Sequence, residues 1–184
     1  MDTQIQTIYR ALLQTTFTKE ACLRRIRIMR EYLEAICFAG EESLSFVEYA
    51  KRVGVTPNDT ETVGHVIAVF RDGLGDTLMR SAVYEVTNGL VGLVETAKTT
   101  ILYLPIPTDT ELVHTIGAWV RSEYDTDMLM EFREDASLGI GAGIAVDGVY
   151  QEYGIRYFLD QHKEELFHIF DTLGEGVLAR KSTA

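Results

Sequence analysis

The sequence predicts an α+β protein, with an N-terminal helical bundle over residues 1–98 and a small α/β module over residues 99–184. Three observations lead to this prediction. Apolar residues recur at helical spacing through the first 98 residues. The pattern then changes at Thr99 to a β-branched and aromatic run, which two prolines end. Further on, an Asp-Gly pair between alternating apolar residues predicts a β-hairpin.

The first predicted helix carries an apolar stripe that includes Ile5, Ile8 and Leu12. Thr18 can cap a second, longer helix, which keeps the same period until Gly40 ends it. On the other face of this second helix we expect a solvated surface, with docking of an acidic helix or a membrane surface as the alternative. The basic residues of that face are Arg24, Arg25, Arg27 and Arg30, followed directly by Glu31 and Glu34.

Three more helices complete the predicted bundle. Ser45 and Glu48 form a capping box before a short helix that closes near Gly54. Pro57 marks the start of the next helix, which runs to Phe70. The last helix runs from Leu78 to Ala97, and Gly73 and Gly75 separate it from the one before. Its apolar side includes Val83, Val86 and Leu90.

The module begins with a predicted strand at residues 99–104 (TTILYL). Thr108 and Glu111 predict a capping box that opens a helix, and residues 128–132 (MLMEF) predict a second strand. Because a strand, a helix and a strand follow one another within about 30 residues, these two strands should be parallel. A hairpin turning at Asp147-Gly148 then extends a mixed sheet, and a terminal helix follows with an apolar stripe to Leu173.

Charge and cysteine content exclude several classes of protein. The formal net charge is −11, with −2 in residues 1–98 and −9 in residues 99–184, which argues against binding nucleic acid. Cys22 and Cys37 suit neither a disulfide framework nor a zinc site, so we expect a reducing compartment. No apolar run is long enough to span a bilayer, and no signal peptide is recognisable at the N-terminus.

The motifs that would carry chemistry are incomplete. Residues 92–99 (GLVETAKT) approach a phosphate-binding loop, but a helix precedes them and a strand follows, which reverses the required order. The glycines at 139, 141 and 143 precede a hairpin and lack the spacing of a dinucleotide site. His162 and His168 are six residues apart, which is unsuitable for a shared metal. We therefore expect no catalytic, cofactor-binding or metal site.

Residues 135–159 (DASLGIGAGIAVDGVYQEYGIRYFL) resemble the C-terminal signature of the delta subunit of F-type ATP synthases, which is called oligomycin-sensitivity-conferring protein in mitochondria. Asp135 and Leu138 fit its opening, Gly141 and Gly143 fit its glycine pair with one residue inserted, and Leu159 fits the first leucine of its helix. Glu152 and Gly154 stand where the family usually has Asp and Ser. The family's order of a helical domain, a strand, a helix and a strand also fits.

The resemblance implies a non-catalytic stator subunit that connects the catalytic head to the peripheral stalk of a proton-translocating ATP synthase. It implies two partners, the N-terminal helices of the alpha subunits for the bundle and b-type stalk subunits for the module. The complex would lie on the cytoplasmic, matrix or stromal face of an energy-transducing membrane, and contact the membrane only through its other subunits. Core packing is the alternative for every candidate contact residue, and these residues are Ile5, Ile8, Leu12, Val83, Val86, Leu90, Phe158, Phe167 and Phe170.

Two other functions stay open at this stage. A peripheral-stalk subunit of a vacuolar or archaeal-type ATPase would share the same architecture. A small regulatory protein could instead bind a ligand in a pocket at residues 139–143, with the bundle transmitting the bound state. An enzyme is the third alternative, although no nucleophile, base and orienting group can be assembled from motif spacing.

Overall fold

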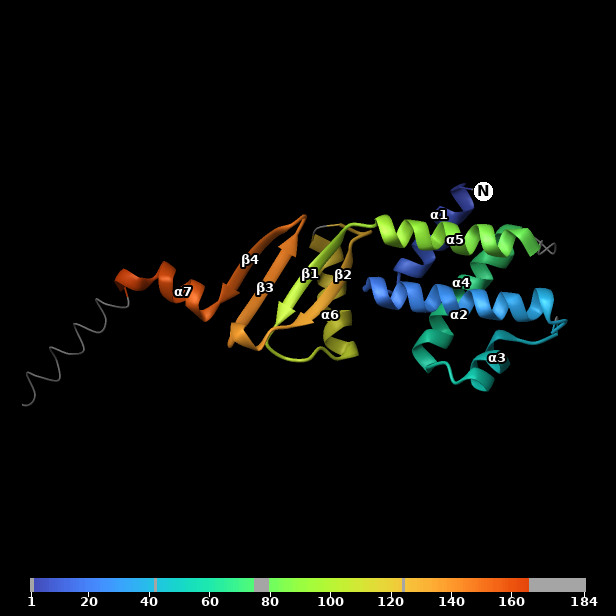
Figure 1. The fold of residues 1–184 in the computed structure, drawn as a ribbon, viewed down its shortest axis with the longest axis horizontal. Helices are drawn as coiled ribbons and strands as arrows, with labels where there is room; N and C mark the ends of the chain where they lie inside the picture. Colours follow the sequence, from blue (N-terminus) through green and yellow to red (C-terminus); the bar gives the residue numbers. More distant parts are fainter. Residues whose placement is uncertain (1, 42, 75–79, 124, 166–184) are drawn as a thin grey trace, which may run out of the picture. The chain divides into compact units, whose positions relative to one another are not determined.

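A computed structural model describes residues 2–41, 43–74, 80–123 and 125–165, and it confirms the predicted α+β class (Figure 1). The helical part consists of α1 (Asp2–Leu13), α2 (Lys19–Phe38), α3 (Phe46–Val53), α4 (Pro57–Leu74) and α5 (Arg80–Thr96). After it come β1 (Thr99–Leu104), α6 (Thr110–Glu123), β2 (Leu129–Glu134), a short 3₁₀ helix η1 (Ala136–Leu138), β3 (Gly141–Val146), β4 (Val149–Gly154) and α7 (Ile155–Gln161).

Local capping residues explain where most helices begin. The Thr18 hydroxyl accepts a hydrogen bond from the Ala21 amide at the start of α2. Ser45 and Glu48 form the predicted capping box before α3, which ends at Gly54 in the left-handed conformation (φ 75°). The capping box predicted at Thr108 is wrong, because α6 begins at Thr110 and Asp109 accepts the hydrogen bond from the Leu112 amide at 2.8 Å. The negative charge of an aspartate at this position is also stabilised by the positive end of the helix dipole.

The core of the helical part is made by one side of each of the five helices. Fully buried side chains include Tyr32 and Leu33 of α2, Phe70 of α4 and Leu90 of α5. Leu129, the first residue of β2, is buried in the same core. The residues that close the hydrophobic interior thus come from both sides of the predicted boundary at Lys98.

The sheet has the strand order β2-β1-β3-β4. The Leu129 amide donates to Lys98 O and the Asp135 amide donates to Leu104 O, so β1 and β2 advance together and are parallel, as predicted. β3 pairs antiparallel with β1 and with β4. The turn from β3 to β4 is the predicted one, since Asp147 and Gly148 both have positive φ (50° and 80°).

By its contacts, the chain divides into two compact units that differ from the predicted domains. The first, called the helical unit below, comprises Met1–Thr100 and Asp109–Glu131. The second, called the sheet unit, comprises Ile101–Thr108 and Phe132–Ala184. The predicted boundary at residue 98 follows the change of hydrophobic period, whereas α6 and the start of β2 group with the helices, because they pack against α1 and the α1–α2 loop.

Two further predictions concern helices at the edge of the described residues. A helix follows the hairpin as predicted, and α7 begins at Ile155 and is described to Gln161. The predicted apolar stripe includes His162, but His162 is exposed. Leu78 and the stripe beyond residue 165 lie outside the described residues.

Candidate interaction surfaces

The contact residues predicted on the bundle lie almost entirely in its interior. Each of these five side chains is at most 1% exposed, which leaves none of them free to contact a partner: Ile8, Leu12, Val83, Val86 and Leu90. Ile5 is partly buried, and its Cδ1 atom lies 2.8 Å from where a Cβ on Gly89 would stand. The stripes of α1 and α5 are therefore buried in the core of the helical unit, and any binding surface must be formed by other residues.

The basic face predicted on α2 is also only partly a surface. Arg25 is buried, and its Nε donates to Asp59 Oδ1 of α4 at 2.9 Å, while its Nη1 donates to Thr15 O and to the Thr16 hydroxyl. Arg24 reaches the same carboxylate oxygen at 3.2 Å. Burial by itself raises the pKa of Asp59, but hydrogen bonds with Arg25, Arg24 and Thr56 outweigh it, so the pKa lies below its ordinary value. This cluster fixes the α1–α2 loop onto α4.

A second arginine, which is partly buried, anchors α6 to the rest of the helical unit. Arg121 donates from Nε to Met128 O at 3.2 Å, from Nη2 to Thr16 O at 2.6 Å and from Nη1 to Leu13 O. Its guanidinium lies 4.6 Å from the centre of the Phe17 ring, and that ring packs so tightly on Gly117 that a Cβ there would lie 2.4 Å from Phe17 Cγ.

Arg121 also lines a hollow of ≈ 590 Å³ with residues of α1 and α6, including Arg10, Gln14 and His114. One N–H on each of its three nitrogen atoms already donates to a backbone carbonyl, so the chain itself holds the guanidinium in place. Cys22 is close enough to feel the charge of Arg121, yet burial raises the pKa of its thiol to about 12. A thiol with that pKa stays protonated and unreactive at neutral pH.

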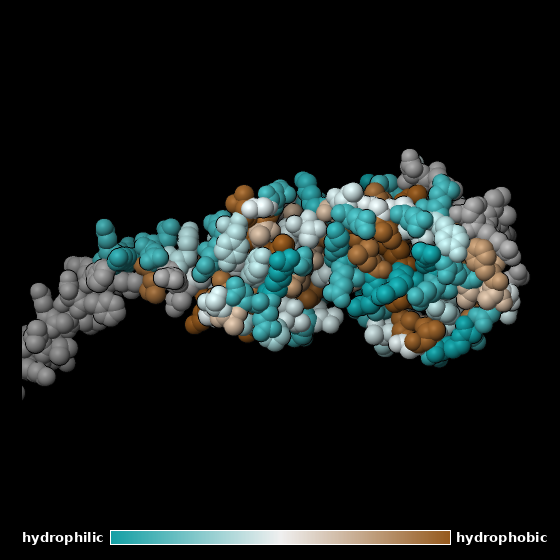
Figure 2. Space-filling view, viewed as in Figure 1, coloured by the Kyte–Doolittle hydropathy of each residue, from teal (hydrophilic) through white to brown (hydrophobic). Residues whose placement is uncertain are grey.

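A groove runs along the surface between α2 and α5, and sequence reasoning did not find it. One part, with a volume of ≈ 390 Å³, is lined by both helices, and a second of ≈ 330 Å³ continues along α2; the two share Leu23 and Arg27. Figure 2 shows hydrophobic surface at this seam with hydrophilic side chains beside it. The available signal was that Leu23 and Val91 are apolar yet lie beside, rather than within, the stripes of their helices.

In the sheet unit, the residues of the resembled signature have distinct structural roles. The Asp135 carboxylate accepts hydrogen bonds from the amide (3.0 Å) and the hydroxyl (2.6 Å) of Ser137, and it thereby caps the start of η1. Leu138, at the end of η1, is buried. These hydrogen bonds hold the pKa of Asp135 below its ordinary value. Gly141 has φ 145° and approaches Gly154 so closely that a Cβ would lie 2.4 Å from its Cα. Gly143 similarly lies directly beneath the Tyr150 ring.

An exposed aromatic group follows the hairpin of the sheet unit. Tyr153, Tyr157 and Phe158 stack edge to face in sequence, with ring centres 5.9 Å and 5.8 Å apart. Phe158 is 57% exposed and Leu159 48%, so both are accessible to a partner. Phe167 and Phe170, the other two predicted contacts, lie outside the described residues.

The search for a metal site covers the part of the chain that the structure describes. No cluster of three or more His, Cys, Asp or Glu side chains there has the geometry to hold a metal ion. Among the described helices, none has the length and hydrophobicity needed to cross a lipid bilayer. In comparisons with known proteins, no protein-family model matches the chain, and no curated protein matches it significantly in sequence.

Proposed function

We propose that the protein is a non-catalytic peripheral-stalk subunit of a proton-translocating F-type ATP synthase, and that it connects the catalytic head to b-type stalk subunits. The observation that carries the proposal is the signature at residues 135–159. Asp135 caps a turn, Leu138 is buried, Gly141 and Gly143 permit close packing of the hairpin, and a helix follows directly. Four of the five signature residues thus have a structural role in the sheet unit, and the fifth, Leu159, is exposed on α7.

The division of the chain supports the same proposal. A connector that resists torque needs two separate binding surfaces on well-packed units. The helical unit offers a groove between two helices, which is the geometry that accepts an amphipathic helix. The sheet unit offers exposed aromatic residues at α7. We assign the head to the first surface and the stalk to the second, at the cytoplasmic, matrix or stromal face of the membrane.

The proposal is tested by affinity purification of the tagged full-length chain from detergent-solubilised membranes of its source. We expect alpha and b-type subunits to be recovered together in near-stoichiometric amounts, as identified by mass spectrometry. Phe158→Ala should reduce recovery of the b-type subunits selectively. The matched control is Val149→Thr, which removes an apolar side chain that is even more exposed (72%) and lies at the other end of β4. Recovery of vacuolar-type stalk subunits, or of no ATPase subunits at all, would contradict the proposal.

A further inference from the structure

The floor of the α2–α5 groove consists of apolar side chains and one threonine whose hydroxyl is already hydrogen-bonded. Leu23 and Val91 are partly buried against the core, and Ile26 is buried below them. Thr87 also lies in the floor, but its hydroxyl donates to Val83 O of its own helix at 2.7 Å. Because that hydroxyl is satisfied within α5, a partner that covers Thr87 leaves no unpaired hydrogen-bonding group.

Contacts between α2 and α5 hold the two helices side by side along the groove. At one end the Lys19 ammonium donates to Glu95 O at 3.3 Å. Toward the other end the Arg30 guanidinium lies over the Tyr84 ring, 5.1 Å from its centre. The two helices are therefore antiparallel neighbours (Figure 1). Between Leu23 and Glu34 the groove extends about 16 Å at 1.5 Å per residue, which accommodates about three helical turns.

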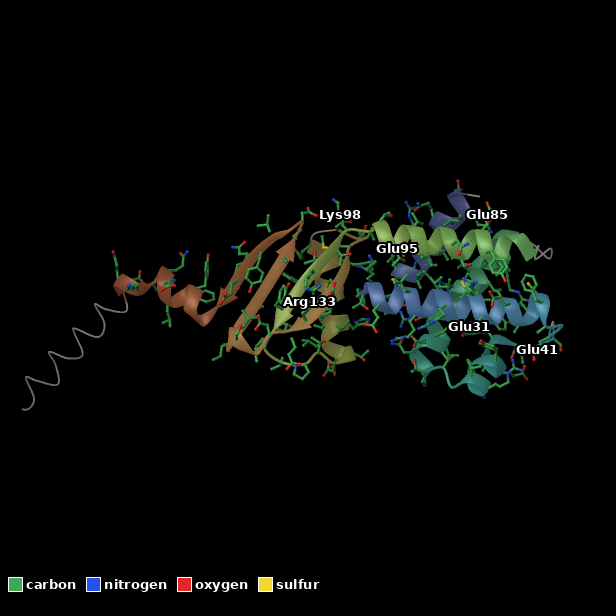
Figure 3. The ribbon with its side chains drawn as sticks, in the orientation of Figure 1. Glu31, Glu41, Glu85, Glu95, Lys98 and Arg133 are labelled. Atoms are coloured by element: carbon green, nitrogen blue, oxygen red, sulfur yellow. The ribbon has the colours of Figure 1, made fainter. Side chains whose placement is uncertain are left out.

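In the part of the groove that both helices line, the rim carries two opposite charges without ion-pair partners. Arg24 pairs with Asp59 and Arg30 with Glu34, but Arg27 and Glu31 form no ion pair with any residue that the structure describes. Both are exposed, and they are four residues apart on α2, so they lie one helical turn from each other (Glu31 is labelled in Figure 3). Beside its apolar floor, this part of the groove therefore presents one cation and one anion that are not paired, and their Cβ atoms lie about 5 to 6 Å apart.

We infer that this groove binds an amphipathic helix that lays its apolar stripe on the floor and places a carboxylate against Arg27 and a basic side chain against Glu31. Opposite charges one turn apart on the rim require opposite charges one turn apart on the partner, in reversed order. The inference rests on the proposed function, within which the occupant is an N-terminal helix of an alpha subunit. Beyond the proposed function, the inference identifies the α2–α5 groove as the binding surface. It also specifies the order of the acidic and basic residues that a bound helix must have.

Two synthetic helices of about 18 residues, long enough to become helical when bound, test the charge order. They share one leucine stripe and differ only in exchanging a glutamate and a lysine four residues apart beside it. We expect the full-length protein to prefer one of them about five- to tenfold, and R27E/E31R, whose net charge is unchanged, to prefer the other. The preference should disappear in 1 M salt, where charges are screened beyond about 3 Å.

The matched control exchanges two opposite charges of the helical unit that do form an ion pair. Glu41 and Arg52 form a bidentate pair, with both N–O distances 2.8 Å, and neither residue lines the groove. The double substitution E41R/R52E should therefore leave the charge preference unchanged. Val91→Glu places a charge on the floor and should abolish binding of both helices without changing the far-ultraviolet circular dichroism spectrum. A charge preference that R27E/E31R leaves unchanged would overturn the inference.

Other occupants and the proposed function itself give different results. Binding of phosphatidylserine vesicles but of neither helix, or self-association that Val91→Glu abolishes, would overturn the inference in favour of a lipid surface or a second copy. If alpha subunits co-purify equally with the wild-type protein and R27E/E31R, the inference fails while the proposed function stands. If R27E/E31R reverses the preference between the two helices but no ATPase subunit co-purifies with the wild type, the proposed function fails, whereas the inference that the groove binds a helix is supported.

Discussion

The buried ion pair between α2 and α4 allows a prediction with a defined magnitude. The side chains of Arg25 and Asp59 are each only 4% exposed, so their attraction is little screened by water. Asp59→Asn keeps the size and one acceptor oxygen of the side chain but leaves the Arg25 cation buried without a counter-charge. Removing one partner of a buried pair costs about 3 to 5 kcal/mol, and we expect the lower end because Arg25 retains Thr15 O and the Thr16 hydroxyl as acceptors.

The assay is urea denaturation followed by circular dichroism at 222 nm, which reports mainly on the helical unit. Glu41→Gln is the control, since the Glu41–Arg52 pair is exposed and its loss should lower the free energy of unfolding far less. Asp59 has a depressed pKa in the folded state, so its stabilisation is fully present above the ordinary value of 3.8 and is lost as pH falls through the lower folded-state pKa. The difference between wild type and Asp59→Asn should shrink in that range. A loss below 1 kcal/mol at pH 7, or a difference that stays constant with pH, would refute this reasoning.

Three other predictions concern single residues. Arg121→Met should detach α6, destabilise the helical unit by about 2 to 3 kcal/mol through unpaired carbonyls, and alter the fluorescence of the chain's single tryptophan, which lies on α6; unchanged emission and stability would contradict this. In a Cys37→Ser background, Cys22 should react with Ellman's reagent only as fast as the protein unfolds, because its pKa is about 12; rapid reaction in native buffer at pH 8 would show an accessible thiolate. Gly141→Ala should accelerate amide exchange across the hairpin, whereas Gly148→Asn, at an open left-handed turn position, should not; equal effects would indicate that the Gly154 contact is unimportant.

Local signals in the sequence were sufficient for most of the elements. The capping residues Thr18 and Ser45, the Asp-Gly turn and the change of period at Thr99 all act within a few residues along the chain, and the structure confirms each of them. The wrong N-cap prediction for α6 is also a local error, displaced by one residue. Thr108 and Asp109 both suit an N-cap, and only the backbone geometry selects between them.

Which apolar residues face a partner was not predictable from periodicity. A stripe such as Ile8 and Leu12 shows only that one side of a helix is buried, and the same pattern serves a core or a binding groove. Because Gly89 has no side chain, Ile5 of α1 can pack closely against α5, and the stripes of both helices are buried in the core. The candidate groove arises instead between α2 and α5, from Leu23 and Val91, which belong to neither stripe.

The sequence by itself determined the α+β class, the order of the elements and the residues that start or end most of them, because each depends on interactions between near neighbours in the chain. Only the tertiary structure decided that Arg25 is buried on Asp59, that Arg121 holds α6 to the α1–α2 loop and that Leu129 completes the core of the helices. These contacts join residues 34 to more than 100 positions apart. Their formation depends on how the elements pack as a whole, which no local pattern specifies.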